Sequence, residues 1–569
     1  MDMNSIKQNY NDWRVYATED KEVVQELTEM QENTELLYDA FYRDLSFGTG
    51  GLRGVIGAGT NRINIYTVRK TTQALANYIK KNFTDNKWKV AISYDSRIKS
   101  NIFSEIVAEV LAANKILVYI YDELMPTPCL SFAVRELDCV AGVMITASHN
   151  SFIYNGYKIY GDDGGQITNV TVNKITNEMQ NINIFHDIQK IDFSIGIQNG
   201  QITYIDEGVI KSYVDNVKQQ SLLDENINKD IRIVYTPLHG AGLKPILRVL
   251  KESGYENINV VKAQMEPDGN FTTCPIPNPE EEQAMKLGLD YAKKINAELL
   301  IATDPDSDRV GAAVQNNQGE YILLSGNEIG LLLFDYICMR RNAINKMPDN
   351  PIVLKTIVTT DMIKDIANHY SVNIIDVLTG FKYIGEKISL LEKNKQQKSF
   401  IFGLEESFGY LSGDYVRDKD AINATLLICE MLAYYKSKTL TLYERLEELY
   451  MQYGYYYNSL HSYEFEGAIG NKKIKNIMDT YRSGISEIAN YFIENIFDYL
   501  TEINELPKSD VLQFVLKDIG SIVIRPSGTE PKLKIYISVK AETREKAILM
   551  EKAIFANIEE NINTIVSDL

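Results

Sequence analysis

The first candidate for chemistry is a hydroxyl group that stands beside two proton carriers. Ser148 lies in the segment 146-TASHN-150, with His149 next to it and Lys158 in the following segment 155-NGYK-158. The small residues around Ser148 predict a hydroxyl exposed at the end of a strand, and such a nucleophile needs a neighbouring base. A helix cap with a surface histidine explains the same residues without catalysis, so both interpretations stay open.

A second loop, 304-DPDSDR-309, carries carboxylates at alternate positions: Asp304, Asp306 and Asp308. Their oxygens can converge on one hard cation, and without a cation charges packed this densely repel one another. A calcium-binding EF-hand also uses alternate aspartates, but it needs Gly and Glu where this chain has Arg309 and Gln315. The EF-hand is therefore excluded, and a solvated acidic turn is the alternative to a metal site. Arg309, directly behind the aspartates, indicates a phosphate contact beside the metal.

Two further loops offer groups that can hold a sugar phosphate. In 403-GLEESFGY-410, Glu405 and Ser407 can accept and donate hydrogen bonds to sugar hydroxyls, and a helix start with an early glutamate is the alternative. The loop 525-RPSGTEP-531 combines an arginine, two hydroxyls and a glycine amide into a candidate phosphate nest: Arg525, Ser527, Thr529 and Gly528. A plain Pro-Ser-Gly turn is the alternative there.

Two more segments place a cation near these loops. The segment 379-TGFKYIG-385 puts Lys382 at a strand–helix junction, and 47-FGTGGLRG-54 puts Arg53 in a glycine-rich turn. The glycines of the second segment can also serve only for tight turns.

One pattern occurs three times along the chain: apolar β-branched runs alternate with amphipathic helices. The three copies end at the loop after residue 145, at the loop after residue 303 and at the loop 403–410. The expected strands lie at 89–95, 116–122 and 139–147, then at 231–237, 257–263 and 297–304, and finally at 351–358, 372–378 and 399–406. The expected helices between them lie at 101–114, 241–253, 280–295 and 361–369. Strands that alternate with helices predict parallel, doubly wound sheets, whose ligand sites lie beyond the carboxyl ends of the strands.

The chain from about residue 456 follows a different pattern. Strand-like runs at 456–466, 519–526 and 533–541 are joined by a helix and followed by a last helix, which predicts an antiparallel sheet. We therefore expect an α/β fold with three successive doubly wound mixed α/β domains plus a C-terminal α+β domain, arranged around a cleft. The expected domains are 1–205, 206–318, 319–455 and 456–569, and each carries one of the four loops. The stretch 179–194 is expected to be an excursion between strands or a linker.

Composition excludes several classes of protein. The 569 residues are 45% hydrophobic and 24% charged, which excludes wholesale disorder, a collagen-like repeat and a small disulfide scaffold. With 59 Lys and Arg against 77 Asp and Glu the net charge is −18, so nucleic acid is not an expected partner. No apolar leader or run of about 18 apolar residues occurs, so no membrane association is expected. The five scattered cysteines are expected to be reduced core thiols of a cytoplasmic protein, with a reactive thiol as the alternative for any one.

Together the four loops predict phosphoryl transfer on a sugar phosphate, in which a metal neutralises the transferring group and fixed donors position the rest. A P-loop kinase is disfavoured, because the chain contains no G-x-x-x-x-G-K-[ST] segment.

The chain resembles the α-D-phosphohexomutases, the phosphoglucomutase/phosphomannomutase family. The segments that carry the resemblance occur in the family's order: 47-FGTGGLRG-54, 146-TASHN-150, 304-DPDSDR-309, 379-TGFK-382, 403-GLEES-407 and 525-RPSGTEP-531. The resemblance implies that Ser148 is a phosphoserine and that its phosphoryl oxygen joins Asp304, Asp306 and Asp308 in binding one Mg²⁺. It further implies that proton transfer or charge neutralisation falls to Arg53, His149, Lys158 and Lys382. Substrate would then be bound by Arg309, Thr379, Gly380, Glu405 and Ser407, and its non-reacting phosphate by Arg525, Ser527, Gly528 and Thr529.

One departure from the family pattern bears on the substrate. Leu404 separates Gly403 from Glu405, and Phe408 follows Ser407, which is similar to the phosphoglucomutase and phosphopentomutase branches rather than to typical phosphomannomutases. The resemblance thus implies a monomeric or homodimeric mutase that interconverts glucose 1-phosphate and glucose 6-phosphate, primed by a sugar 1,6-bisphosphate. A phosphopentomutase, a phosphomannomutase or a sugar-bisphosphate synthase is the alternative on the same fold. The remaining alternatives are a metal-dependent phosphatase and a non-catalytic sugar-phosphate-binding protein.

Overall fold

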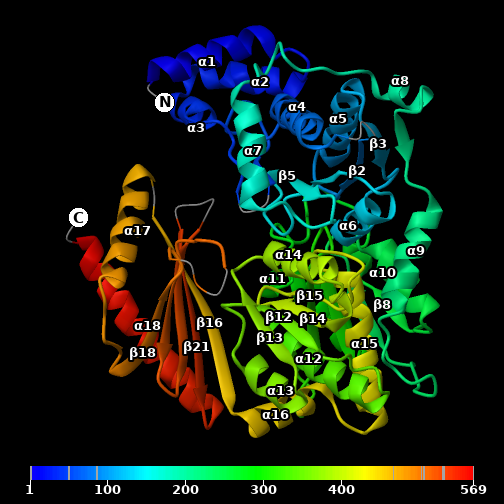
Figure 1. Cartoon of the computed structure of the whole chain (residues 1–569), viewed down its shortest axis with the longest axis vertical. Helices are drawn as coiled ribbons and strands as arrows, with labels where there is room; N and C mark the ends of the chain where they lie inside the picture. Colours follow the sequence, from blue (N-terminus) through cyan, green and yellow to red (C-terminus); the bar gives the residue numbers. More distant parts are fainter. Residues whose placement is uncertain are drawn as a thin grey trace.

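The chain folds into four sheets with helices packed on them (Figure 1). This computed structural model describes residues 3–567 apart from 49–50, 85–87, 466, 502, 504–505 and 528–531. In Figure 1 the first domain lies at the top, the second and third lie below it, and the fourth lies at the lower left. The predicted class, three α/β domains followed by a C-terminal α+β domain, is confirmed.

The first domain begins with three helices, α1 (Met3–Tyr16), α2 (Lys21–Glu29) and α3 (Thr34–Phe41). Its sheet has the order β1-β5-β4-β2-β3-β6. The strands are β1 (Gly51–Val55), β2 (Lys89–Tyr94), β3 (Leu117–Ile120), β4 (Ala141–Ile145), β5 (Tyr154–Gly161) and β6 (Ile202–Tyr204). The helices around it are α4 (Ile65–Asn82), α5 (Ser100–Ala113), α6 (Thr127–Glu136), α7 (Asn169–Gln180) and α8 (Phe193–Gln198). The stretch 179–194 is the expected excursion, since it runs from α7 to α8 between β5 and β6.

The second domain follows helix α9 (Glu207–Lys218) and has the sheet order β11-β10-β9-β7-β8. Its strands are β7 (Ile233–Thr236), β8 (Ile258–Val260), β9 (Leu299–Thr303), β10 (Val310–Gln315) and β11 (Tyr321–Leu324), with helices α10 (Leu243–Glu252) and α11 (Glu282–Ile295). Because β11 pairs with β10, this sheet extends past residue 318, the predicted end of the domain. All five residues of β9 are buried, as expected for a central parallel strand covered on both faces.

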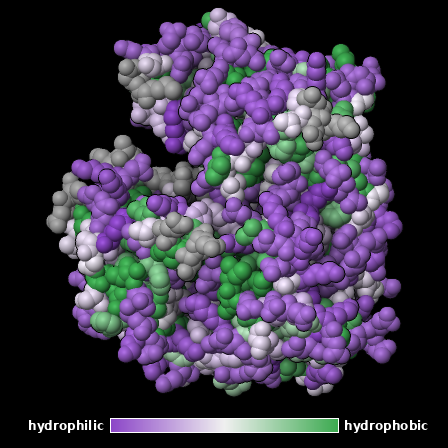
Figure 2. All heavy atoms as spheres, in the orientation of Figure 1, coloured by the Kyte–Doolittle hydropathy of each residue, from purple (hydrophilic) through white to green (hydrophobic). Residues whose placement is uncertain are grey.

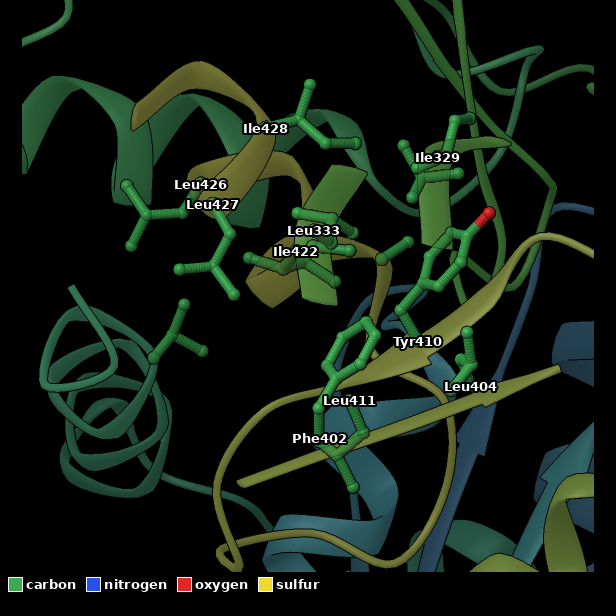
Figure 3. Close-up of a cluster of buried hydrophobic side chains, with 14 of the residues drawn as sticks. Ile329, Leu333, Phe402, Leu404, Tyr410, Leu411, Ile422, Leu426, Leu427 and Ile428 are labelled. Carbon is green, nitrogen blue, oxygen red and sulfur yellow. The ribbon is translucent and has the colours of Figure 1, made fainter. Parts of the chain in front are cut away.

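The third domain has the sheet order β13-β12-β14-β15. Its strands are β12 (Ile352–Thr356), β13 (Asn373–Val377), β14 (Phe400–Glu405) and β15 (Gly409–Leu411), and its helices are α12 (Gly326–Ala343), α13 (Met362–Tyr370), α14 (Phe381–Lys393), α15 (Ala421–Ser437) and α16 (Leu442–Tyr453). Figure 3 shows Leu404 and Tyr410, which flank the loop between β14 and β15, packed with apolar side chains of α12 and α15. This core holds the loop in place.

The fourth domain is a fully antiparallel sheet of order β16-β21-β20-β19-β18-β17, with two helices. The predicted strands correspond to β16 (Tyr455–Glu464), β20 (Gly520–Pro526) and β21 (Lys532–Ala541), and the helices are α17 (Gly467–Arg482) and α18 (Arg544–Ser567). Three further strands carried too little alternation to be predicted: β17 (Glu487–Ile488), β18 (Tyr491–Asp498) and β19 (Leu512–Leu516). Figure 2 shows the molecular surface indented between this domain and the first.

All five cysteines are buried and unpaired, as predicted. Burial raises the pKa of the Cys274 thiol to about 11, which argues against the reactive-thiol alternative at that residue. Within the described residues, no helix combines the length and the apolar character that a membrane span requires.

Candidate active site

A cleft of about 1240 Å³ runs between the four domains. Its walls include nine of the residues predicted from the sequence: Arg53, His149, Arg309, Thr379, Gly380, Glu405, Ser407, Arg525 and Ser527. Six of them lie at or beside the ends of β4, β9, β14 and β20, whereas Arg53 lies on β1 and Thr379 and Gly380 follow β13. The prediction that the four loops meet in one cleft agrees with this geometry.

Ser148 lies at the first-domain edge of this site, in a left-handed backbone conformation with φ of 52°. Its Oγ donates a hydrogen bond to Asp304 Oδ2 at 2.8 Å, and His149 Nδ1 is 3.4 Å from the same Oγ. The prediction that this hydroxyl is exposed was wrong, because Ser148 is only 3% exposed. The contact with the second domain covers it.

A buried network that the sequence did not indicate holds the Ser148 loop. Arg97 donates hydrogen bonds to four main-chain carbonyls of this loop and its continuation: Ser148, Asn150, Ser151 and Tyr154. Asp95 lies 3.3 Å from the Arg97 guanidinium and accepts a 2.6 Å hydrogen bond from Thr146, whose hydroxyl in turn accepts from the Ser148 amide. Arg97 thus sets the loop conformation through charge-assisted hydrogen bonds.

The three aspartates form one buried cluster, in which a ligand oxygen from each lies within 4.8 Å of the others. Burial, together with the carboxylates of Asp306 and Asp308, raises the pKa of Asp304 well above its ordinary value. Burial also opposes the charge of Asp306, but Lys158 and the Thr127 hydroxyl stabilise it more strongly and lower its pKa. Asp306 Oδ1 and Asp308 Oδ1 are buried, and neither has a hydrogen-bond partner in the part of the chain that the structure describes. Two unpartnered carboxylate oxygens are what a hard-cation site requires, and a solvated turn does not bury them.

Two lysines from different domains flank the cluster. Lys158 Nζ, on β5, lies 2.8 Å from Asp306 Oδ2 and 3.4 Å from Asp308 Oδ2. Lys419, just before α15, lies 3.1 Å from Asp308 Oδ2. Burial disfavours the charge of each lysine, but the neighbouring aspartates outweigh it and raise both pKa values. Sequence reasoning missed Lys419, because no local pattern relates it to Asp308, which lies more than a hundred positions away.

Arg309 connects the aspartate loop to the predicted sugar loop. Its Nη1 donates to the Ser407 carbonyl at 2.8 Å, and its guanidinium lies 3.9 Å from the Glu405 carboxylate. Glu280, which the sequence analysis did not single out, contacts the same guanidinium at 3.5 Å. Ser407 Oγ donates to Glu405 Oε1 at 3.2 Å. The prediction that Glu405 and Ser407 act together is consistent with this contact.

Lys382 and Gly380 lie where α14 begins. Gly380 has φ of 117°, a conformation that favours glycine, and Thr379 Oγ1 beside it is buried without a hydrogen-bond partner. Lys382 Nζ donates to Asn169 Oδ1 at 3.2 Å, so it reaches the first domain. Burial lowers the pKa of Lys382 to about 8. Its charge is therefore sensitive to pH close to neutrality.

The fourth domain presents Arg525 and Lys534 to the cleft from neighbouring strands, directly opposite each other in the ladder. Arg525 Nε is buried and has no hydrogen-bond partner among the described residues, and its guanidinium lies 6.0 Å from the ring centre of Tyr536. Burial and Arg525 lower the pKa of Lys534. Sequence reasoning missed Lys534. The signal that could have found it is its alternation with apolar residues on β21, the strand that pairs with the strand of Arg525. The predicted residues Gly528 and Thr529 lie outside the described residues.

Arg53 lies on β1, at the entrance to the Ser148 loop. Its Nη1 donates to Asn150 Oδ1 at 2.7 Å. Burial, reinforced by the positive charges of Arg309 and Arg53, lowers the pKa of His149 well below its ordinary value, so the ring is neutral.

Comparison with known proteins agrees with this geometry. Four sequence profiles of phosphoglucomutase/phosphomannomutase match in order: α/β/α domain I at residues 44–184, domain II at 211–319, domain III at 325–453 and the C-terminal domain at 495–554. A phosphoglucomutase from Staphylococcus saprophyticus is 38% identical over 525 residues, which cover 90% of this chain and 94% of that protein. One from Staphylococcus aureus is 37% identical over 515 residues, covering 88% and 91%.

Solved structures share the fold at low sequence identity. The open form of parafusin, a phosphoglucomutase from Paramecium, superimposes with a TM-score of 0.67 at 20% identity and covers 92% of this chain and 95% of its own. A phosphoglucomutase/phosphomannomutase family protein from Burkholderia thailandensis gives a TM-score of 0.66 at 16% identity, covering 91% and 97%.

Proposed function

The chain belongs to the phosphoglucomutase/phosphomannomutase family, and we propose that it interconverts glucose 1-phosphate and glucose 6-phosphate. In this proposal the phosphoryl group is carried by Ser148, and a glucose bisphosphate is the bound intermediate. One observation carries the proposal. A buried hydroxyl lies 2.8 Å from one of three clustered, buried carboxylates, and the residues next to them, His149 and Arg309, line a cleft whose walls also hold Arg525 and Lys534.

The aspartate cluster fits one Mg²⁺. The oxygens Asp306 Oδ1 and Asp308 Oδ1 have no hydrogen-bond partner, and oxygen ligands of this kind are what Mg²⁺ prefers. Asp304, Asp306 and Asp308 would hold the ion together with an oxygen on Ser148. When bound, it supplies positive charge that offsets the charge developing on a transferring phosphoryl group.

The protein's own cations complete the charge balance around Ser148. Phosphorylated Ser148 would give its phosphoryl group to the free hydroxyl of the sugar, so that a new P–O bond forms while the bond to Oγ breaks. The sugar hydroxyl would give its proton to a base such as the neutral His149, and Ser148 Oγ would take a proton from an acid such as Lys158. Lys158 and Lys419 both contact the aspartate cluster, and Arg53 on β1 and the neutral His149 beside Ser148 line the cleft. These groups hold positive charge and hydrogen-bond donors where the phosphoryl group passes.

The other two loops would hold the rest of the substrate. Glu405 and Ser407, braced by Arg309, would bind the sugar hydroxyls, and Lys382, Thr379 and Gly380 line the approach. Arg525 and Ser527, with Lys534, would bind the non-reacting phosphate. We refer to Arg525 and Lys534 as the phosphate cradle. After transfer the bisphosphate would turn over, so each of its phosphates in turn occupies the cradle while the other returns to Ser148. The burial of Ser148 supports this sequence, because water would otherwise hydrolyse the phosphoserine.

The test is phosphate-position exchange on the 1-phosphates of glucose, mannose, N-acetylglucosamine and ribose, with trace glucose 1,6-bisphosphate as primer. We expect glucose 1-phosphate to be converted with the highest kcat/KM. Faster conversion of ribose or mannose 1-phosphate would reassign the substrate on the same fold. Release of free phosphate without isomerisation would instead identify a phosphatase. We further propose small-molecule sugar phosphates as the partners, a sugar 1,6-bisphosphate as the primer, a monomer or homodimer as the assembly, and the cytoplasm as the location.

A further inference from the structure

Glu406 is a cleft carboxylate to which the mechanism above assigns no role. It stands between Glu405 and Ser407 and lines the cleft. Thr356 Oγ1 donates a 2.9 Å hydrogen bond to Glu406 Oε2, and Thr359 Oγ1 lies 3.5 Å from the same oxygen. The side chain is therefore fixed to the turn that follows β12, and not merely solvated at the surface.

The turn that holds Glu406 is also where the fourth domain docks. Ile357 and Val358, between the two threonines, pack in one buried cluster with Val523 and Tyr536 of the fourth domain. Tyr536 stands beside the Arg525 guanidinium. The contacts therefore run from Glu406 through the turn at 356–359 to the phosphate cradle.

Glu406 lines the same cleft as the cradle residues Arg525 and Lys534 and as Tyr536. Burial raises the pKa of Tyr536 to about 12, and the Glu406 carboxylate adds to the rise while Arg525 opposes it. Burial and Arg525 lower the pKa of Lys534, and Glu406 acts against that lowering. Two residues of β21, Lys534 of the cradle and its neighbour Tyr536, thus experience a negative charge from the third domain.

We propose that Glu406 is a counter-charge that weakens the hold of the phosphate cradle on the substrate phosphate, so that the bisphosphate can leave the cradle and turn over. The inference rests on the proposed mutase function. A phosphate in the cradle is attracted by Arg525 and Lys534 and repelled by Glu406, and the net affinity is the difference. Because both ends of the intermediate must occupy the cradle in turn, an overly tight hold slows turnover.

Two variants separate charge from position. Glu406→Gln removes the charge and keeps an oxygen that can accept from Thr356. Glu406→Asp keeps the charge but is too short to preserve that hydrogen bond. Each is combined with Ser148→Ala, which removes chemistry, and the affinity for glucose 1-phosphate is measured by titration calorimetry. We expect the Gln variant to bind roughly three- to tenfold more tightly, and the Asp variant to bind like the parent.

The same substitutions in the active enzyme test the consequence for turnover. Glu406→Gln should lower both KM and kcat, and its gain in affinity should shrink as ionic strength rises, because salt screens the charge. Glu545→Gln, an exposed change on α18, controls for the altered net charge and should change neither constant.

Unchanged or weaker binding by Glu406→Gln would overturn the inference, and so would equal tightening by the Asp variant, which would show an effect of position. Circular dichroism and the thermal midpoint check that each variant is folded. These outcomes are distinct from failure of the proposed function, which would appear as no exchange of phosphate position in the wild-type enzyme.

Discussion

At the scale of single residues, Ser148 differs from a surface serine in both backbone and environment. Its φ of 52° and its hydrogen bond to Asp304 place the hydroxyl against carboxylates that would otherwise repel an incoming phosphoryl group. The site therefore requires added positive charge at this point, which is consistent with the proposed metal and with the two flanking lysines.

We predict that Ser148→Ala abolishes isomerisation, because the hydroxyl is the proposed phosphoryl carrier. The variant should still fold, since leaving the buried Asp304 oxygen without its donor costs about 1–3 kcal/mol, less than the total stability of a typical domain. Intact-mass spectra should show one phosphoryl group on the wild-type protein and none on the variant. Near-normal turnover by the variant would remove Ser148 from the mechanism.

Asp306→Asn should strongly lower turnover while sparing much of the affinity for sugar phosphate. The change removes one of the cluster's charges and the partner of Lys158, and it weakens a hard-cation site. The measurement is turnover against Mg²⁺ concentration, in which the variant should need more metal for half-maximal activity. Full wild-type activity in excess chelator would contradict the metal assignment for all three aspartates.

We predict that activity depends on pH through Lys382, because burial lowers the pKa of this lysine to about 8. Neutralising the charge of a phosphate, the role implied for Lys382, needs the protonated amine, which is lost as pH rises through 8. We expect kcat/KM to fall above about pH 8 with that apparent pKa. In Lys382→Arg the side chain stays charged, and the falling limb should disappear even if activity is lower. A limb that persists in the variant would assign the titration to another group.

At the scale of elements, the loop after β4 depends on Arg97 at the loop after β2. Removing this arginine would leave the buried Asp95 unpaired and loop carbonyls without donors, at a cost of about 3–5 kcal/mol. We predict that Arg97→Met lowers both the thermal midpoint and the fraction of phosphorylated Ser148. Lys244→Met is the matched control, because it breaks only the exposed ion pair with Glu123 and should have little effect. An unchanged phosphorylated fraction in Arg97→Met would show that the loop holds its shape without this arginine.

The strands that lead into the site loops were largely predictable from the sequence. The central strands β4 and β9 are continuous apolar runs, and a polar loop follows each directly, so periodicity located both the strand and the site at its end. The short strands β10 and β15 pair antiparallel with their neighbours and were not expected. Both return directly after a site loop. The three residues of β15 are too few to show a period, and β10, VGAAVQ, shows no alternation of apolar and polar residues.

Side chains that reach the site from another element were not predictable in the same way. Arg97 acts through main-chain carbonyls, which leave no trace in the sequence around it. Lys419 contacts the aspartates only because the first three domains converge on the same point. Local patterns report which residues share a strand or a helix, whereas these contacts depend on how separate elements pack.

At the scale of the whole molecule, the cleft concentrates cations in a protein of net charge −18. Arg53, Arg309, Arg525 and Lys534 all line it, and Lys158 and Lys419 lie beneath. The described cleft walls hold seven Lys and Arg against six Asp and Glu, so an anionic substrate is repelled less there than by the chain as a whole, which has 59 against 77. Because these groups come from different domains, binding also requires all four domains to be in place.

A substitution of Arg525 tests whether binding requires the fourth domain, which lies farthest along the chain from Ser148. We predict that Arg525→Ala raises KM for both glucose monophosphates, because a charge-assisted hydrogen bond of this kind contributes about 1.5–3 kcal/mol, or roughly ten- to a hundredfold in affinity. Turnover should fall less than with Ser148→Ala, since the bond-breaking step lies at the other wall. Some kcat is still lost, because a weakly held bisphosphate escapes before it turns over. Added glucose 1,6-bisphosphate should therefore rescue this variant more than it stimulates the wild type. Unchanged KM in both directions would show that the fourth domain does not hold the phosphate.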